Sequence, residues 1–119
     1  MQITAAQHKL MKELASQGDC IIVGRCADVI LLELKSMNIF VYASQHSKLK
    51  RCQNRAEENE HFTEKKMKQI DQERAAYRGL FTEEEWGKKE AYHLCINTSD
   101  TEIKTLIPAL AEYVRLWFA

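Results

Sequence analysis

The chain has 119 residues, of which 45% are hydrophobic and 29% charged, and its 17 basic and 17 acidic side chains give a formal net charge of zero. This composition predicts one packed domain and argues against a disordered chain. The neutral charge balance argues against a dedicated nucleic-acid binder, so no nucleic-acid partner is expected. No apolar run approaches the roughly 20 residues that span a bilayer, so no membrane partner is expected either.

Helices and short apolar strands alternate along the first half of the chain. Residues 4–17 have the pattern of an amphipathic helix, and the β-branched, apolar residues 20–23 predict a strand covered on both faces. A helix is expected over residues 27–34, and a second buried strand over residues 38–43. Another helix follows over residues 46–58.

The second half continues the alternation. A helix is predicted over residues 63–78, with an irregular segment after it. A third strand is expected over residues 93–97. Ser99 or Asp100 is the predicted cap of a final helix, as Ser44 or Ser47 is for the helix that follows the second strand.

This order of elements predicts an α/β fold. We expect three layers, with a mostly parallel sheet of about three strands flanked by helices. Ligands of such sheets bind beyond the carboxyl ends of the strands. Arg25 directly follows the first predicted strand and is therefore expected at that edge.

Gly24 and Arg25 are the first candidate binding residues. Glycine lets the backbone turn sharply, and the planar guanidinium of arginine can bind a phosphate or a base edge through several N–H groups. The start of the next helix adds backbone N–H groups that favour an anion. A structural alternative, an ion pair between Arg25 and Asp28, remains open at this point.

The later helices carry further arginines. At 100° per residue, Asp71, Arg74 and Arg78 fall on one side of their predicted helix, at the border of its apolar face. Arg51 and Arg55 lie four residues apart in the preceding helix. Like charges at this spacing repel weakly, and an anionic ligand would relieve that repulsion. Surface pairing with nearby acids is the alternative explanation.

The four cysteines and the histidines give no metal-ligand spacing. Cys20, Cys26, Cys52 and Cys95 contain no CxxC pair. We therefore expect no metal site formed by the chain, reduced thiols and a cytoplasmic location.

Five segments together resemble one family. The segments CIIVGRCADVIL, NIFVYAS, RCQNR, IDQERAAYRG and EEWGKKEAYHLCINTS resemble the cytidylate kinase-like proteins, relatives of bacterial cytidylate kinase among the P-loop nucleoside monophosphate kinases. Their order and spacing agree from about residue 5 to the end of the chain. The resemblance implies a P-loop kinase-like fold and an ancestral transfer of the γ-phosphoryl group of ATP, with Mg²⁺, to CMP.

The resemblance also implies roles for particular residues. Arg51 and Arg74 take catalytic roles, in which arginines stabilise the migrating phosphoryl group. Residues 46–80 correspond to a lid-like helical region. The residues implied to bind the nucleotide are Gly24, Arg25, Asp28, Arg55, Asp71 and Arg78.

One departure from the family is the glycine-rich phosphate loop. The chain has only Gly18, Gly24, Gly79 and Gly87, and no two are close enough to form such a loop. Residues 1–119 therefore resemble the C-terminal part of the family domain, and we expect a truncated or degenerate kinase. The alternative is a non-catalytic nucleotide-sensing or protein-interaction module.

The missing part has a consequence for the sheet. In the family, the absent first strand lies between the strands that correspond to residues 20–23 and 38–43. Its removal leaves a gap of about 10 Å, because neighbouring strands lie ~4.8 Å apart. We expect the chain either to pair these two strands directly, or to fill the gap from a second copy or a partner chain.

Overall fold

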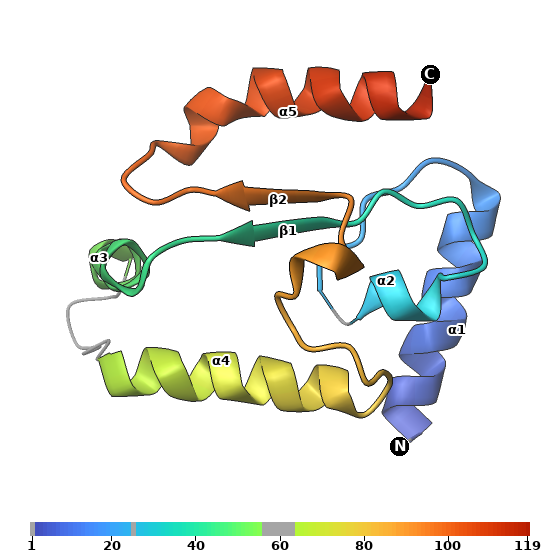
Figure 1. Cartoon of the computed structure of the whole chain (residues 1–119). Coiled ribbons are helices and arrows are strands. Elements are labelled where there is room, and N and C mark those ends of the chain that lie inside the picture. Colours follow the sequence, from blue (N-terminus) through green and yellow to red (C-terminus); the bar gives the residue numbers. More distant parts are fainter. Residues whose placement is uncertain (1, 25, 56–63) are drawn as a thin grey trace.

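The computed structural model of the chain describes residues 2–24, 26–55 and 64–119 (Figure 1). In these residues it has five α-helices, one 3₁₀ helix and two strands. In chain order these are α1 (Gln2–Gln17), α2 (Ala27–Ile30), β1 (Ile39–Tyr42), α3 (Gln45–Arg55), α4 (Glu64–Gly79), η1 (Lys89–Ala91), β2 (Leu94–Asn97) and α5 (Ile103–Phe118).

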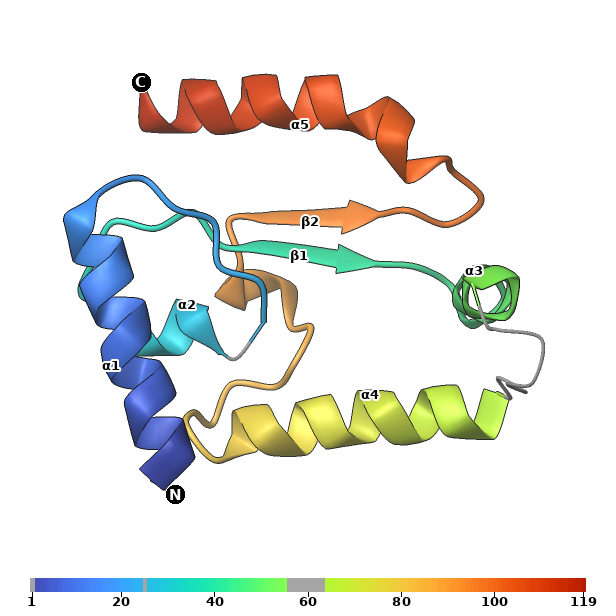
Figure 2. The same ribbon diagram turned by 180° about the vertical axis from the view of Figure 1, so that it is seen from behind.

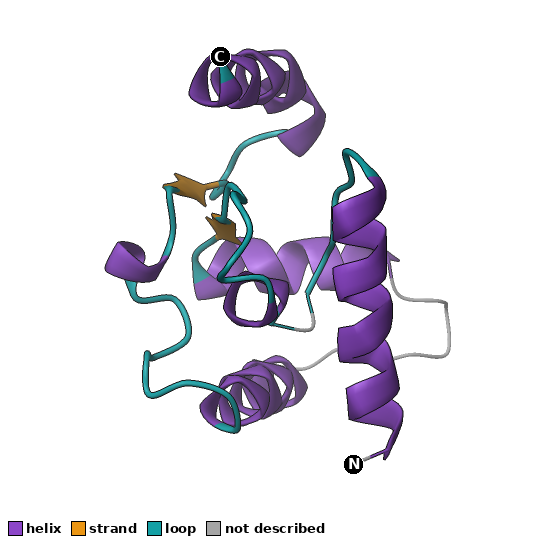
Figure 3. Cartoon of the chain, turned by 90° about the vertical axis from the view of Figure 1, so that its right-hand side faces the viewer, coloured by secondary structure: helices purple, strands orange, loops and turns teal. Residues whose placement is uncertain are grey.

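A two-stranded parallel sheet lies at the centre of the described chain. Ile39 of β1 lies opposite Leu94 of β2, and Tyr42 lies opposite Asn97. Figure 3 views the strands nearly end-on and places α1 and α5 on one side of the sheet and α4 on the other. This arrangement confirms the predicted three-layer α/β fold.

The strand predicted over residues 20–23 does not form. These residues pass the amino ends of the two strands (Figures 1 and 2), and they carry no strand assignment. Ile21 and Val23 are 94% and 88% exposed. A strand exists only when it is paired, and the described sheet contains β1 and β2 alone, so this segment has no strand partner in it. The prediction of direct pairing with the second strand is therefore wrong, and one edge of β1 has no strand partner in the described part of the chain.

The end of one helix and the start of another also differ from the prediction. The helix expected over residues 27–34 is only the single turn α2. Helix α5 begins after Glu102, because the two predicted caps are engaged elsewhere. Ser99 Oγ accepts a hydrogen bond from the Ser44 N–H, and the Asp100 carboxylate accepts one from the Ser47 hydroxyl.

The cap of α3 is confirmed, since Ser44 Oγ accepts a hydrogen bond from the Ser47 N–H. The predicted end of this helix, at residue 58, lies outside the described residues.

The apolar core is thin. Met11, Leu31 and Met67 are the buried hydrophobic side chains of the described chain. Many other large apolar side chains remain exposed, including those of residues that the sequence predicts to be buried. No helix in the described part of the chain is both long and apolar enough to cross a bilayer.

Candidate functional site

An ion pair between Arg78 and Asp28 joins the end of α4 to α2. The Arg78 side chain is 3% exposed and the Asp28 side chain 17%. Nη1 of Arg78 donates to both carboxylate oxygens of Asp28, at 3.1 and 2.9 Å. Two residues that lie 50 positions apart and that the family resemblance assigned to nucleotide binding are therefore in direct contact.

The remaining N–H groups of Arg78 are incompletely paired. Nε and Nη2 are buried and have no hydrogen-bond acceptor among the described residues. Oε2 of Glu84 lies 3.5 Å from Nη2, and the Glu84 side chain is 58% exposed. The Nε–Nη2 edge is the one through which a guanidinium binds two oxygens of a phosphate or carboxylate. Buried donors without acceptors are costly, so this edge is a candidate anion site.

Aromatic side chains border the Arg78 guanidinium. The Tyr92 ring lies 5.5 Å from Cζ of Arg78 and 4.8 Å from the Phe40 ring, and the Phe40 ring lies 5.5 Å from that of Trp86. Gly87 has φ +84°, and a Cβ atom there would lie 3.2 Å from Phe40 Cζ. Glycine thus permits the loop to approach the aromatic cluster closely.

The charges at this site are those of Arg78 and its acidic neighbours. Burial lowers the pKa of Arg78, but its hydrogen bond with Asp28 and the charge of Asp28 outweigh that effect, so its pKa is raised. Burial raises the pKa of the Cys26 thiol, and nearby Arg78 offsets part of that rise. Burial likewise raises the pKa of Tyr92. The thiol and the phenol are therefore neutral near pH 7.

The turn at Gly24 agrees with the sequence analysis. Its φ of +75° lies in the left-handed region that favours glycine, and the Ala27 N–H donates to its carbonyl oxygen at 3.3 Å. The predicted binding residue Arg25 lies outside the described residues, as does the side chain of Arg55. Their predicted roles remain predictions.

A second ionic cluster links α3 to the middle of α4. Nζ of Lys48 lies 2.6 Å from Oδ2 of Asp71, and Nη1 of Arg74 lies 3.7 Å from Oδ1 of Asp71. Arg74 is 65% exposed. Sequence analysis missed Lys48, because a contact between two helices leaves no mark in the spacing along either one. Seven residues separate Asp71 from Arg78, about 10 Å along the helix axis, so the two clusters are distinct.

Arg51 is engaged in contacts with the loop that follows β2. Its guanidinium donates to Oγ1 of Thr98 at 2.9 Å, to the Thr98 carbonyl oxygen, and to the Thr101 carbonyl oxygen at 3.2 Å. Thr98 is 2% exposed, and its hydroxyl donates to the carbonyl oxygen of Tyr42 at 2.9 Å. These bonds fix α3 to the carboxyl ends of both strands.

The described residues do not fit a seat for Mg²⁺ and ATP. Among them, no three His, Cys, Asp or Glu side chains are grouped as metal ligands. The carboxylates of Asp28 and Asp71, the acids that the resemblance assigned to the site, are held by Arg78 and Lys48. The chain also has no glycine-rich loop to hold the donor phosphates.

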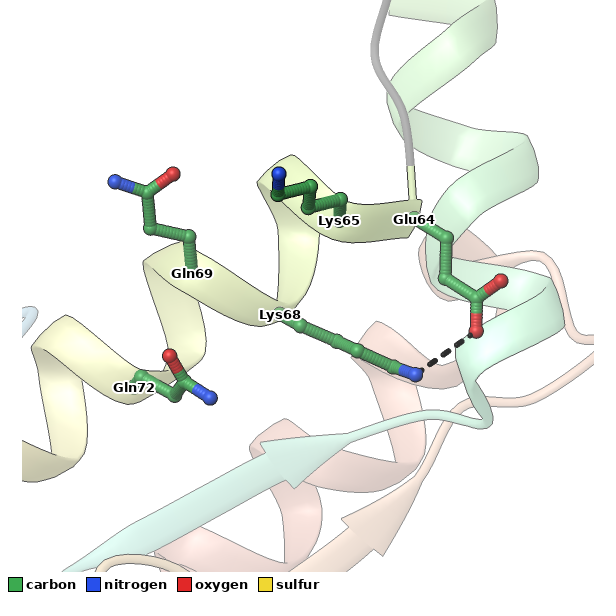
Figure 4. Close-up of a pocket in the computed structure, with 5 residues that line it drawn as sticks. All are labelled: Glu64, Lys65, Lys68, Gln69 and Gln72. Carbon is green, nitrogen blue, oxygen red and sulfur yellow. Dashed lines mark ion pairs between the residues drawn. The ribbon is translucent and has the colours of Figure 1, made fainter.

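A shallow concavity of about 600 Å³ lies along the outer face of α4 (Figure 4). In Figure 4 the side chains of Lys65 and Lys68 point away from each other, and Lys68 forms a surface ion pair with Glu64 at 3.2 Å. All of its lining residues are exposed and come from one helix. This surface contains no residue that the sequence analysis assigned to the site.

The chain is similar to proteins of one family. A model of the cytidylate kinase-like family matches residues 1–100. The crystal structure of an uncharacterized protein from Eubacterium ventriosum is similar with a TM-score of 0.81 and 27% sequence identity. The match covers 95% of this chain and 65% of that structure, so the chain spans less than two thirds of its length. No curated protein matches the sequence.

Proposed function

Because the chain belongs to the cytidylate kinase-like family, we propose that it binds a nucleoside monophosphate, CMP or a close relative, at Arg78. Family membership supports a kinase-like ancestry and nucleotide binding in general. The observation that carries the proposal for this chain is the buried guanidinium of Arg78, two of whose donors have no acceptor among the residues that the structure describes. A phosphate group would supply the missing oxygens.

The binding mode follows from the contacts of Arg78. Asp28 holds Nη1 and so fixes the plane of the guanidinium. The phosphate takes the Nε–Nη2 edge and displaces the Glu84 carboxylate, which lies 3.5 Å from Nη2. Glu84 is mostly exposed, so its displacement into solvent costs little. The Tyr92 ring borders the same guanidinium and is positioned to contact the rest of the nucleotide.

We further propose that the chain does not transfer a phosphoryl group by itself. Phosphoryl transfer depends on a metal ion and on cations placed around the migrating group. Here Arg51 is bonded to Thr98 and Thr101, and Asp71 is paired with Lys48. With ATP and CMP we expect no ADP formation by the 119-residue chain.

The second candidate function is a non-catalytic module that binds a protein. The observation that favours it is the large number of exposed apolar side chains, among them Ile21, Val23 and Leu32, which are 79–94% exposed. The two functions are compatible, since the Arg78 site and this apolar surface use different residues.

Calorimetric titration with CMP tests the proposed binding, with AMP as the comparison nucleotide. The Glu84→Gln variant should bind CMP about threefold more tightly, because a competing carboxylate is removed from Arg78. The matched Glu85→Gln variant, altered at the neighbouring exposed residue, should bind like the wild type. Absence of binding to both the wild type and Glu84→Gln would contradict the proposal.

A further inference from the structure

A concavity lies beside Arg78, between the end of α4 and the loop that follows it. Its volume is about 380 Å³, and it is lined by Ala75 and Gly79 of α4 and by residues 82–86. Glu84 is one of these lining residues, and its Oε2 atom lies 3.5 Å from Nη2 of Arg78. The concavity therefore adjoins the edge of the guanidinium that has no hydrogen-bond acceptor among the described residues.

Hydrogen bonds hold the wall of the concavity in place. The loop after α4 turns back toward η1 (Figures 1 and 2). At the start of this loop, the N–H groups of Phe81 and Thr82 donate to the carbonyl oxygen of Arg78 at 3.0 and 3.2 Å. Near its end, the Gly87 N–H donates to the Tyr92 hydroxyl at 3.4 Å. A wall that is fixed before a ligand arrives lowers the entropic cost of binding.

Trp86 supplies an aromatic surface to the concavity. Its ring meets the Phe40 ring edge to face, with the centroids 5.5 Å apart and an angle of 86° between the planes. This contact holds the ring in place, while the Trp86 side chain stays half-buried and lines the concavity. Two other lining residues, Ala75 and Gly79, have a small side chain or none, which leaves room for a flat ring. The concavity is therefore suited to an aromatic group that stacks on Trp86.

The charges around the concavity decide which part of a nucleotide it can hold. Glu83, Glu84 and Glu85 are exposed lining residues, and their carboxylates repel a phosphate group. The guanidinium of Arg78 attracts the phosphate instead. Nucleobases are uncharged near pH 7, and aromatic side chains stack on them. The charges therefore favour one orientation, with the phosphate at Arg78 and the base in the concavity.

We propose that this concavity holds the base of the nucleotide and that the Trp86 ring stacks against it. The inference rests on the proposed binding of the phosphate at Arg78 and adds the position of the base. Stacking on an aromatic ring is possible for every base. Trp86 therefore contributes affinity and orientation, whereas it does not select cytosine.

Calorimetry with CMP and ribose 5-phosphate tests the inference, because ribose 5-phosphate carries the phosphate and the sugar but no base. The wild-type chain should bind CMP about tenfold more tightly than ribose 5-phosphate. Trp86→Leu should remove this difference, since it lowers the affinity for CMP and leaves the affinity for ribose 5-phosphate unchanged. Trp86→Phe keeps an aromatic ring and should retain most of the affinity for CMP.

Tryptophan fluorescence gives a second readout, which does not require the Trp86→Leu variant to fold. The chain has two tryptophans, and the second, Trp117, packs against His93 and Phe118. In Trp117→Phe, whose tryptophan emission comes from Trp86, CMP should quench the fluorescence as it saturates the site, and ribose 5-phosphate should not. In Trp86→Phe, whose tryptophan emission comes from Trp117, CMP should cause no change.

The possible results separate this inference from the proposed function. If the wild-type chain binds neither CMP nor ribose 5-phosphate, the phosphate site at Arg78 is wrong, and the proposed position of the base is wrong with it. If the chain binds both with equal affinity, the phosphate site stands and the stacking on Trp86 is overturned. Equal weakening of both ligands by Trp86→Leu, or an unchanged Trp86 emission at saturating CMP, would also overturn it.

Discussion

Arg51 and Arg78 lie on successive long helices, and the two differ in how their N–H groups are satisfied. Arg51 of α3 donates to a threonine hydroxyl and two carbonyl oxygens at the carboxyl ends of the strands. Arg78 of α4 is more deeply buried. Its Nη1 donates to Asp28, but its Nε and Nη2 have no hydrogen-bond acceptor in the described part of the chain. Arg51 finds acceptors within the chain, whereas Arg78 lacks acceptors for two of its nitrogen atoms among residues 2–24, 26–55 and 64–119.

We expect this difference in hydrogen-bond acceptors to distinguish a structural arginine from a ligand-binding arginine better than charge or residue spacing does. Both arginines belong to pairs four residues apart, and the family resemblance implies a role for both. Burial of an unsatisfied donor costs free energy, and the proposed ligand would supply the acceptors that Arg78 lacks among the described residues. The contrast predicts that removing Arg78 affects both stability and binding, and that removing Arg51 affects stability alone.

The largest expected effect comes from Arg78→Ala. The substitution leaves the Asp28 carboxylate, 17% exposed, without its cation, and we expect a loss of about 3 kcal/mol in the free energy of unfolding. Urea denaturation followed by circular dichroism measures it. The double variant Arg78→Met with Asp28→Leu removes both charges and should be more stable than Arg78→Ala. If it is equally unstable, uncompensated charge is not the cause.

A smaller effect is expected for Arg51→Ala. It removes hydrogen bonds from a charged donor to Thr98 and Thr101, which should lower the free energy of unfolding by about 2 kcal/mol. CMP affinity should not change, because these contacts lie away from Arg78. Arg115→Ala, which removes an exposed arginine of α5, is the control and should be nearly neutral. A loss of CMP binding in Arg51→Ala would contradict the prediction that Arg51 contributes to stability alone.

Much of the fold follows from the sequence, because its elements are local. The β-branched run before Ala43 predicts β1, and Ser44 caps α3 as expected. Residues 20–23 show where local prediction fails. Their apolar pattern is that of a strand, but a strand needs a neighbour, and pairing is a property of the whole sheet.

The candidate site could be predicted in part. The family resemblance selected Asp28 and Arg78, which the structure brings into contact, but spacing could not show that they pair with each other. Residue spacing also could not show the hydrogen bonds of Arg51 to Thr98, or the ion pair between Lys48 and Asp71. Each of these contacts joins different elements, so each depends on tertiary structure.

The smallest expected effect is a pH dependence of the free energy of unfolding, caused by two side chains near Arg78. Burial raises the pKa of Cys26 and of Tyr92 above their ordinary values of 9.0 and 10.0, so the folded state holds these protons more tightly than the unfolded state. The free energy of unfolding should therefore fall as the pH rises above about 9, where the unfolded chain loses these protons first. Urea denaturation between pH 8 and pH 10 measures the slope, which Cys26→Ser should flatten at its lower end and Tyr92→Phe at its upper end. Thr98 and Thr101 do not titrate in this range, so Arg51→Ala should keep the wild-type slope. An equal slope in all four proteins would show that neither the thiol nor the phenol is coupled to folding.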